Sequence, residues 1–208
     1  MRSKLTFLHQ RLMARPTEFN RDQAVIAAMK LFWCQGYTAT SLSQLLEAMG
    51  IGRSSFYAAF GDKRSLFIEC LELFFRRTRD IMQDAWNTHR SPSAFGEFFH
   101  RTLFEVPEAR ARRGCMMVNS VLELADVDEE LNSMAASHLA DIEALFADCF
   151  RSSQENGDYP EGQSAEDLAA CLMVINQGLR VASRKAVPQT VLRSTVDSSL
   201  AVMGLAVP

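Results

Sequence analysis

The 208-residue sequence has no apolar run long enough to cross a membrane, because Arg, Asp or Glu interrupts the longest candidates. Its five cysteines and four histidines are scattered, without the paired spacing of a disulfide framework or a zinc site. The alternating runs of β-strands are absent. So are a nucleophile–base pair, a glycine-rich phosphate loop and a carboxylate dyad at a recognisable spacing. We therefore expect an all-α protein that is not an enzyme and holds no metal or cofactor.

A secretion signal is missing as well. The first residues are basic, but they contain neither a sustained apolar segment nor a small-residue cleavage site. The expected location is therefore the cytoplasm. A second methionine, Met13, offers another possible start, and residues 1–12 would then be either a flexible basic arm or no part of the protein. The choice between Met1 and Met13 stays open.

Charge is unevenly distributed along the chain. Residues 1–64 hold nine Lys or Arg and four Asp or Glu, a net charge of +5. The remaining residues hold thirteen and twenty-one, a net charge of −8, so the whole chain carries −3. A basic end on an acidic body suits a protein that presents one end to a polyanion.

The pattern of residues 40–63 predicts two short helices joined by a Gly-Ile-Gly turn. The first helix has apolar residues at helical spacing, a cap from Thr40 or Ser41, and Gly50 to end it in the left-handed conformation. The second begins at Arg53, ends at Gly61 and presents small, basic and hydroxyl residues outward. This is the pattern of a DNA-binding helix-turn-helix. The alternative is an ordinary helical hairpin.

The second short helix carries the expected base-reading residues. Arg53 at its start can donate two hydrogen bonds to a guanine edge. Ser54 and Ser55 are small enough to let the helix enter the groove, although they would serve equally well as helix caps. Tyr57 can donate its phenol hydroxyl to a phosphate oxygen, or it can be a partly exposed packing residue.

Other residues are candidates for phosphate contacts. Thr38, Thr40 and Ser41 lie where hydroxyls and free amides could hold the DNA backbone. Lys63 and Arg64 begin the next helix, where the helix dipole disfavours positive charge by a few tenths to about 1 kcal/mol. A phosphate opposite Lys63 would explain this placement, whereas the alternative is a solvated basic pair offset by Asp62.

Helical periodicity predicts nine helices in all. Besides the two short ones, they cover residues 21–35, 62–86, a segment beginning at 91–92, 115–125, a helix from the acidic segment 126–130 to 154, 165–185 and 188–205. Residues 1–64 are expected to form the basic arm and DNA-binding domain. Residues 65–208 are expected to form a second, helical domain.

Cys115 is the most specific candidate in the second domain. The segment Arg112-Arg113-Gly114-Cys115 places a thiol at a helix N-terminus with two cations nearby, and both effects lower a thiol pKa. On this hypothesis Cys115 is alkylated faster than the other four cysteines. The alternative is a small apolar cysteine that packs into the bundle.

The stretch from about Arg21 to Leu73 resembles the N-terminal domain of the TetR family of one-component transcriptional repressors. The matching residues are Ala27-Ala28-Met29-Lys30-Leu31-Phe32, Gly36-Tyr37, Thr40-Ser41, Leu45, Gly50-Ile51, Phe56-Tyr57, Phe60, Lys63 and Leu66. Ala58-Ala59 stands where many members have larger polar residues, so operator contacts cannot be transferred wholesale.

This resemblance implies a nine-helix bundle that binds a palindromic double-stranded DNA operator as a homodimer and is released by a small-molecule effector. Leu192, Val196, Ser199, Leu200 and Met203 would form the dimer stripe. Trp86, Phe99, Met116 and Met117 would contact the effector, unless they are plain core.

The resemblance also extends to Cys115. The Gly114-Cys115 pair at the start of the helix predicted over residues 115–125 resembles the glycine-cysteine pair of a TetR subgroup that senses reactive electrophiles or oxidants. The competing hypothesis is a small helical enzyme or thiol-dependent redox protein built around Cys115, for which the sequence shows no catalytic partner.

Overall fold

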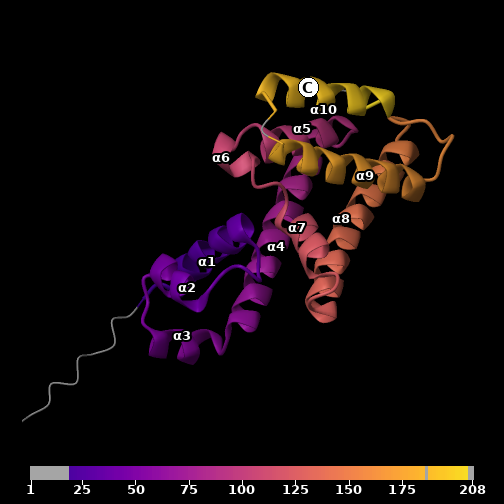
Figure 1. Ribbon diagram of the computed structural model, residues 1–208. Coiled ribbons are helices and arrows are strands. Elements are labelled where there is room, and N and C mark those ends of the chain that lie inside the picture. The colour runs from indigo at the N-terminus through magenta and orange to yellow at the C-terminus, as the bar shows by residue number, and fades with distance from the viewer. Residues whose placement is uncertain (1–18, 186, 206–208) are drawn as a thin grey trace, which may run out of the picture.

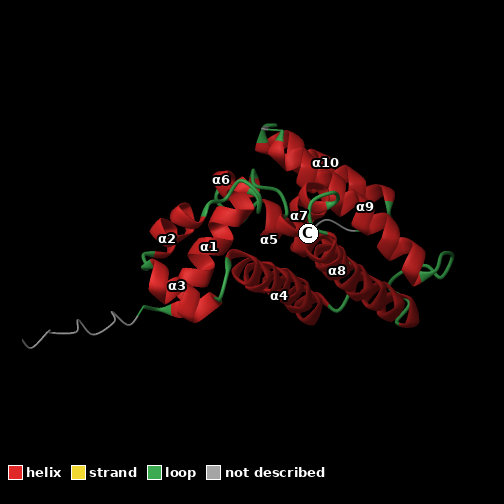
Figure 2. Ribbon diagram, turned by 60° about the horizontal axis from the view of Figure 1, so that its bottom comes forward, coloured by secondary structure: helices red, strands yellow, loops and turns green. Residues whose placement is uncertain are grey.

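The computed structural model describes residues 19–185 and 187–205, and within these ranges all regular structure is helical (Figures 1 and 2). The helices are α1 (Arg21–Gln35), α2 (Leu42–Met49), α3 (Arg53–Phe60), α4 (Lys63–His89), α5 (Ser93–Leu103), α6 (Glu108–Ala111), α7 (Met116–Leu124), α8 (Glu129–Glu155), α9 (Ala165–Arg184) and α10 (Gln189–Val202). The nine expected helices are present. The added element is α6, a single turn between Pro107 and Gly114. The expected basic arm lies outside the described residues.

Helices α1, α2 and α3 form what we call the head, at one end of α4 (Figure 1). The side chain of Ser41 accepts the backbone N–H of Gln44, and the side chain of Gln44 accepts the backbone N–H of Ser41. This reciprocal capping box fixes the start of α2. Gly50 ends α2 with φ 65°, a left-handed conformation in which a glycine has no steric penalty. Helix α3 then buries Phe56 and Phe60, so the helix-turn-helix has the predicted inward face.

Helix α4 joins the head to the remaining helices, which we call the body. It contacts α1 and α3 in the head and α5, α7 and α8 in the body. Its N-cap is Asp62, whose side chain accepts the backbone N–H of Ser65 at 2.7 Å. The helix continues without a break to His89. The predicted domain boundary between residues 64 and 65 therefore lies within its first turn.

The core of the body is built from aromatic rings on α5 and α8. The ring of Phe95 lies 4.5 Å from that of Phe150 and 5.7 Å from that of Phe146. All three side chains are fully buried. These contacts pack α5 against α8, and α9 also packs against α8.

Helix α10 covers α9 and α5 with its apolar stripe. Leu192, Val196 and Leu200 are no more than 5% exposed within one protomer. Our assignment of these three residues to the dimer interface is therefore wrong, whereas Ser199 and Met203 are partly exposed and their assignment stays a prediction. An amphipathic helix buries one face, and in α10 that face is already buried against its own chain.

Candidate nucleic-acid interface and buried cavity

The polar side chains on the outward face of α3 have no polar partner among the described residues. Within the described residues, the side chains of Arg53, Ser54, Ser55 and Tyr57 make no hydrogen bond or ion pair, and Arg53 and Ser54 are exposed. Tyr57 is 48% exposed and only its ring is packed, edge-on to Phe56 at 5.5 Å. The predicted base-reading residues thus lie together on one accessible surface.

The capping alternative for the two serines is not realised. The N-cap of α3 is Gly52, which makes no side-chain cap hydrogen bond. Ser54 and Ser55 lie inside the first turn of the helix instead. The backbone N–H groups of that turn and the serine hydroxyls remain available to a partner.

Thr40 and Ser41 serve the fold of the head. Thr40 is fully buried, and its hydroxyl donates to the carbonyl oxygen of Gly36 at 2.6 Å. It cannot reach a phosphate, so its assignment to DNA binding is wrong. Ser41 is exposed but its side chain caps α2. Thr38 is exposed. Among the described residues its side chain makes no hydrogen bond, unlike the side chains of Thr40 and Ser41.

The two cations at the start of α4 have different surroundings. Arg64 forms ion pairs with Asp128 at 3.2 Å and Glu130 at 2.7 Å, which tie α4 to the start of α8. Lys63 has its Nζ 4.5 Å from the centroid of the Tyr37 ring. Partial burial lowers the pKa of Lys63, although Glu123 opposes this shift. Of the two cations, Lys63 is the one left for a phosphate.

Glu123 on α7 forms a contact between body and head that the sequence did not predict. Its carboxylate oxygens accept the backbone N–H groups of Tyr37 at 3.0 Å and Thr38 at 2.7 Å. Gly36, with φ 88°, lies so close that an added Cβ would be 2.4 Å from the Glu123 carboxylate. Position 36 therefore requires glycine for both its backbone conformation and this approach.

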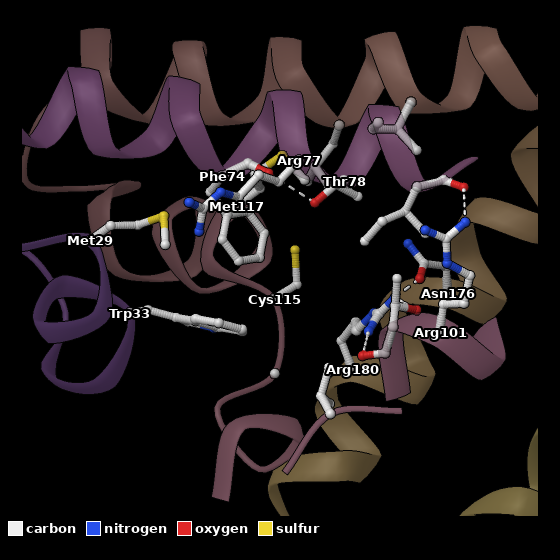
Figure 3. Close-up of a pocket in the computed structure, with 16 residues that line it drawn as sticks. Met29, Trp33, Phe74, Arg77, Thr78, Arg101, Cys115, Met117, Asn176 and Arg180 are labelled. Carbon is white, nitrogen blue, oxygen red and sulfur yellow. Dashed lines mark hydrogen bonds between the residues drawn. The ribbon is translucent and has the colours of Figure 1, made fainter. Parts of the chain in front are cut away.

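A cavity of about 60 Å³ lies among α1, α4, α5, α7, α8 and α9 (Figure 3). Its wall combines aromatic, sulfur-containing and aliphatic side chains with three arginines and a few neutral polar groups. The lining residues are Met29, Trp33, Phe74, Arg77, Thr78, Ile81, Arg101, Thr102, Val106, Gly114, Cys115, Met117, Leu139, Ile142, Asn176 and Arg180.

The cavity contains some of the predicted effector residues. Cys115 and Met117 line it, whereas Met116 lines a separate open groove between α1 and α7. Trp86 and Phe99 line neither space. Trp86 lies more than a turn beyond the part of α4 that reaches the cavity, and Phe99 is fully buried in the core.

Burial raises the pKa of the Cys115 thiol, opposite to the predicted shift. Arg180 and the backbone N–H groups of Val118 and Met117 offset burial only in part. The nearby cation is Arg180 from α9. Arg113, which we expected to stabilise a thiolate, instead lies over the ring of Trp33 at 5.9 Å. The expectation of a low thiol pKa is therefore wrong, because local sequence does not reveal how deeply a helix N-cap is buried.

The polar side of the cavity is centred on Arg180, which the sequence analysis missed. Its Nε donates to the side-chain oxygen of Asn176 at 3.2 Å. Its Nη1 and Nη2 donate to the carbonyl and hydroxyl oxygens of Thr102 at 3.2 and 2.7 Å. The sequence contains one signal for this site: Asn176 and Arg180, four residues apart, interrupt the apolar stripe of residues 165–185.

Among the described residues, no group of three or more His, Cys, Asp or Glu side chains is placed to hold a metal ion. None of the helices in that part of the chain has both the length and the apolar character needed to cross a membrane.

Comparison with known proteins identifies both parts of the chain. The family model described as bacterial regulatory proteins, tetR family, matches residues 25–70. The model described as tetracyclin repressor-like, C-terminal domain, matches residues 97–196.

Individual relatives agree with these matches. The HTH-type transcriptional repressor ComR of Escherichia coli is 30% identical over 173 residues, covering 82% of this chain and 82% of ComR. A cysteine mutant of the TetR family transcriptional regulator CifR, solved in complex with 26-bp double-strand operator DNA, is 29% identical. It superposes with a TM-score of 0.82 over 90% of this chain and 98% of CifR.

These matches include the head, α4 and most of the body, and they exclude the alternative of a thiol enzyme built around Cys115. They also agree with the exposed, unpartnered face of α3. The chain belongs to the TetR family of DNA-binding transcriptional regulators.

Proposed function

We propose that the protein is a homodimeric repressor that binds a palindromic operator in the cytoplasm and is released by a small molecule bound in the cavity. The observation that carries the proposal is the outward face of α3, where Arg53 and Tyr57 are exposed and have no internal polar partner. The operator complex of CifR, at 29% identity, supports the same mode of binding.

On this proposal, Arg53 donates its hydrogen bonds to a guanine, and Ser54 and Ser55 allow close approach to the groove floor. Tyr57, Thr38 and Lys63 contact backbone phosphates and set the register of α3 on the duplex. Ser41 remains the cap of α2 and contributes to DNA binding only by positioning.

The dimer interface is proposed to use the outer faces of α9 and α10. Cys171, Val174, Gly178 and Val181 recur at helical spacing along the exposed side of α9, and Val174 is 69% exposed. On α10 the exposed side consists mostly of small residues and ends at Val202, which is 88% exposed. An apolar and small-residue face of two adjacent helices suits packing against its own copy.

The position of the cavity supports a route from effector to DNA. Helix α4 begins in the head and lines the cavity with Phe74 and Arg77. Helix α7 follows Cys115 at the cavity and holds Glu123, which accepts hydrogen bonds from the head. A ligand that displaces α4 or α7 would therefore change the separation of two heads in a dimer.

Cys115 is proposed as a ligand contact and as a slow target for electrophiles small enough to enter the cavity. N-Ethylmaleimide should first label Cys34, which is exposed and lies outside the proposed dimer interface. Mass spectrometry that finds Cys115 labelled first would contradict the protonated, buried thiol. A Cys115→Ser variant should still bind DNA.

The function is tested by a gel shift with the DNA upstream of the protein's own gene. We expect a complex that survives excess random DNA, and a protected region with two related half-sites about one helical turn apart or somewhat more. Reporter expression from this DNA should rise when the gene is deleted. Equal competition by random and upstream DNA would contradict specific operator binding.

A further inference from the structure

Arg180 is a buried cation without a counter-charge. Arg180 lies near the C-terminal end of α9 and is only 7% exposed, and its side chain points to the cavity (Figure 3). All three hydrogen-bond acceptors that it uses, the side-chain oxygen of Asn176 and the two oxygens of Thr102, are neutral. A guanidinium has five N–H groups, so two of them have no protein acceptor.

The surroundings increase the positive charge. Among the residues that line the cavity there is no Asp or Glu, whereas Arg101 lies on the same side as Arg180, and Arg77 lies on the opposite side beside Phe74 and Met117 (Figure 3). Arg101 pairs with Asp84 at 3.6 Å, but the Asp84 side chain is 66% exposed and lies outside the lining. Cys115 is the titratable neighbour of Arg180, and burial keeps its thiol protonated by raising its pKa. An uncompensated buried charge is unfavourable unless a partner is supplied.

The side of the cavity away from Arg180 is lined mainly by apolar side chains, with Arg77 and Thr78 beside them (Figure 3). Phe74, Met29 and Met117 come from α4, α1 and α7 and lie on the side away from Asn176 and Arg180 (Figure 3). A cavity of about 60 Å³ has room for roughly four water molecules. A ligand of about four heavy atoms matches this space as it stands, and a larger ligand requires the flexible side chains of Met29 and Met117 to move.

We propose that this cavity binds a small organic carboxylate, with its charged end at Arg180 and its apolar part against Phe74 and Met117. The planar guanidinium matches the two oxygens of a carboxylate. This assignment rests on the proposed function, since it names the chemical class of the effector. The alternative is that Arg180 only braces α5 against α9 through Thr102.

Isothermal titration calorimetry of the DNA-free protein separates these possibilities. The probes are sodium butyrate and sodium benzoate, compared with butyramide and benzamide, which have the same shape without the charge. We expect at least tenfold tighter binding of each carboxylate than of its amide. Equal affinities, or no saturable binding of either carboxylate, would overturn the proposal. Phosphate and chloride at the same ionic strength should bind more weakly, and equal affinity for them would overturn the assignment to an organic acid.

A pair of variants locates the site. Arg180→Gln should weaken carboxylate binding at least tenfold and leave amide binding unchanged. Arg184→Gln removes an exposed arginine one turn further along α9, outside the cavity lining, and should change neither. Carboxylate preference that survives Arg180→Gln would refute the role of Arg180. If that variant fails to fold, the comparison of acid and amide on the wild-type protein still decides.

The readout keeps this proposal separate from the proposed function. Calorimetry uses no DNA, so a failure of operator binding leaves the carboxylate site intact. Specific operator binding without any carboxylate binding refutes the ligand class and leaves the repressor intact. Release of operator DNA by butyrate or benzoate, lost in Arg180→Gln and kept in Arg184→Gln, supports both.

Discussion

In the head, Arg53 extends from the first turn of α3 into solvent and has no polar partner within the described chain. In the body, Arg180 is 7% exposed, and its hydrogen-bond acceptors are all neutral. Neither arginine is explained by stability of the protomer. An exposed unpaired cation contributes little to folding, and a buried one is unfavourable. On the two proposals above, each arginine acquires a negatively charged partner when DNA or a carboxylate binds.

The two regions differ in how such a partner is admitted. The surface of α3 is open and lies on a short helix, so it can approach a large polyanion without rearrangement. The cavity lies among six helices and has a volume of about 60 Å³, so its ligand must be small. Two residues connect the regions. Glu123 on α7 accepts hydrogen bonds from the head, and Arg64 at the start of α4 forms ion pairs with the start of α8.

The largest expected effect comes from the interface that would unite two heads. Val174→Glu places a charge on the exposed side of α9 and should convert the dimer to monomers, with loss of operator binding. A monomer contacts one half-site only. Sedimentation and gel shifts measure both outcomes. Val127→Glu, at a residue 59% exposed between α7 and α8, is the matched control and should remain dimeric. A dimeric Val174→Glu would refute this interface.

Arg53→Ala tests whether the head reads bases. Loss of a bidentate contact to guanine should cost about 1–3 kcal/mol per half-site at the operator. Binding to random DNA should change much less. Quantitative gel shifts with both DNAs give the comparison. Equal losses on the two DNAs would move Arg53 from base reading to phosphate contact.

Lys63→Ala should have a smaller and uniform effect. Removing one phosphate contact weakens binding to every sequence and lowers the salt slope by roughly one unit per half-site. Lys30→Ala, at an exposed lysine on α1, is the control of equal charge and should leave the slope unchanged. The measurement is affinity at several salt concentrations. An unchanged slope for Lys63→Ala would remove it from the interface.

The smallest expected effect concerns His138, a second buried polar group of the body. Burial lowers the pKa of His138, although Glu72 and Asp141 oppose the shift. The unfolded chain therefore binds a proton near pH 6 that the folded chain does not bind. The free energy of unfolding should then fall as the pH drops from 7.5 to 5.5. His138→Phe should reduce that fall in urea unfolding, and an identical pH dependence would contradict it.

Much of the head could be predicted from the sequence, since its signals are local. The glycine pair at 50 and 52, the cap at Ser41 and the inward Phe56 and Phe60 each act within a few residues. The prediction for Thr40 was wrong, because a hydroxyl near a helix start can equally bond back to Gly36, and only the fold decides which. For Cys115, local charges suggested a low pKa, whereas burial by distant helices raises it.

Periodicity and caps by themselves determined where the helices lie, because hydrogen bonds and apolar spacing within a helix depend on neighbouring residues. They also determined that α10 has one apolar face, but not whether that face meets its own chain or a second copy. The tertiary structure decided that Leu192, Val196 and Leu200 pack inward. It likewise brought Arg180 to Thr102, 78 residues away, and Glu123 to Tyr37, 86 residues away. Such contacts depend on how whole helices pack, and no local pattern specifies them.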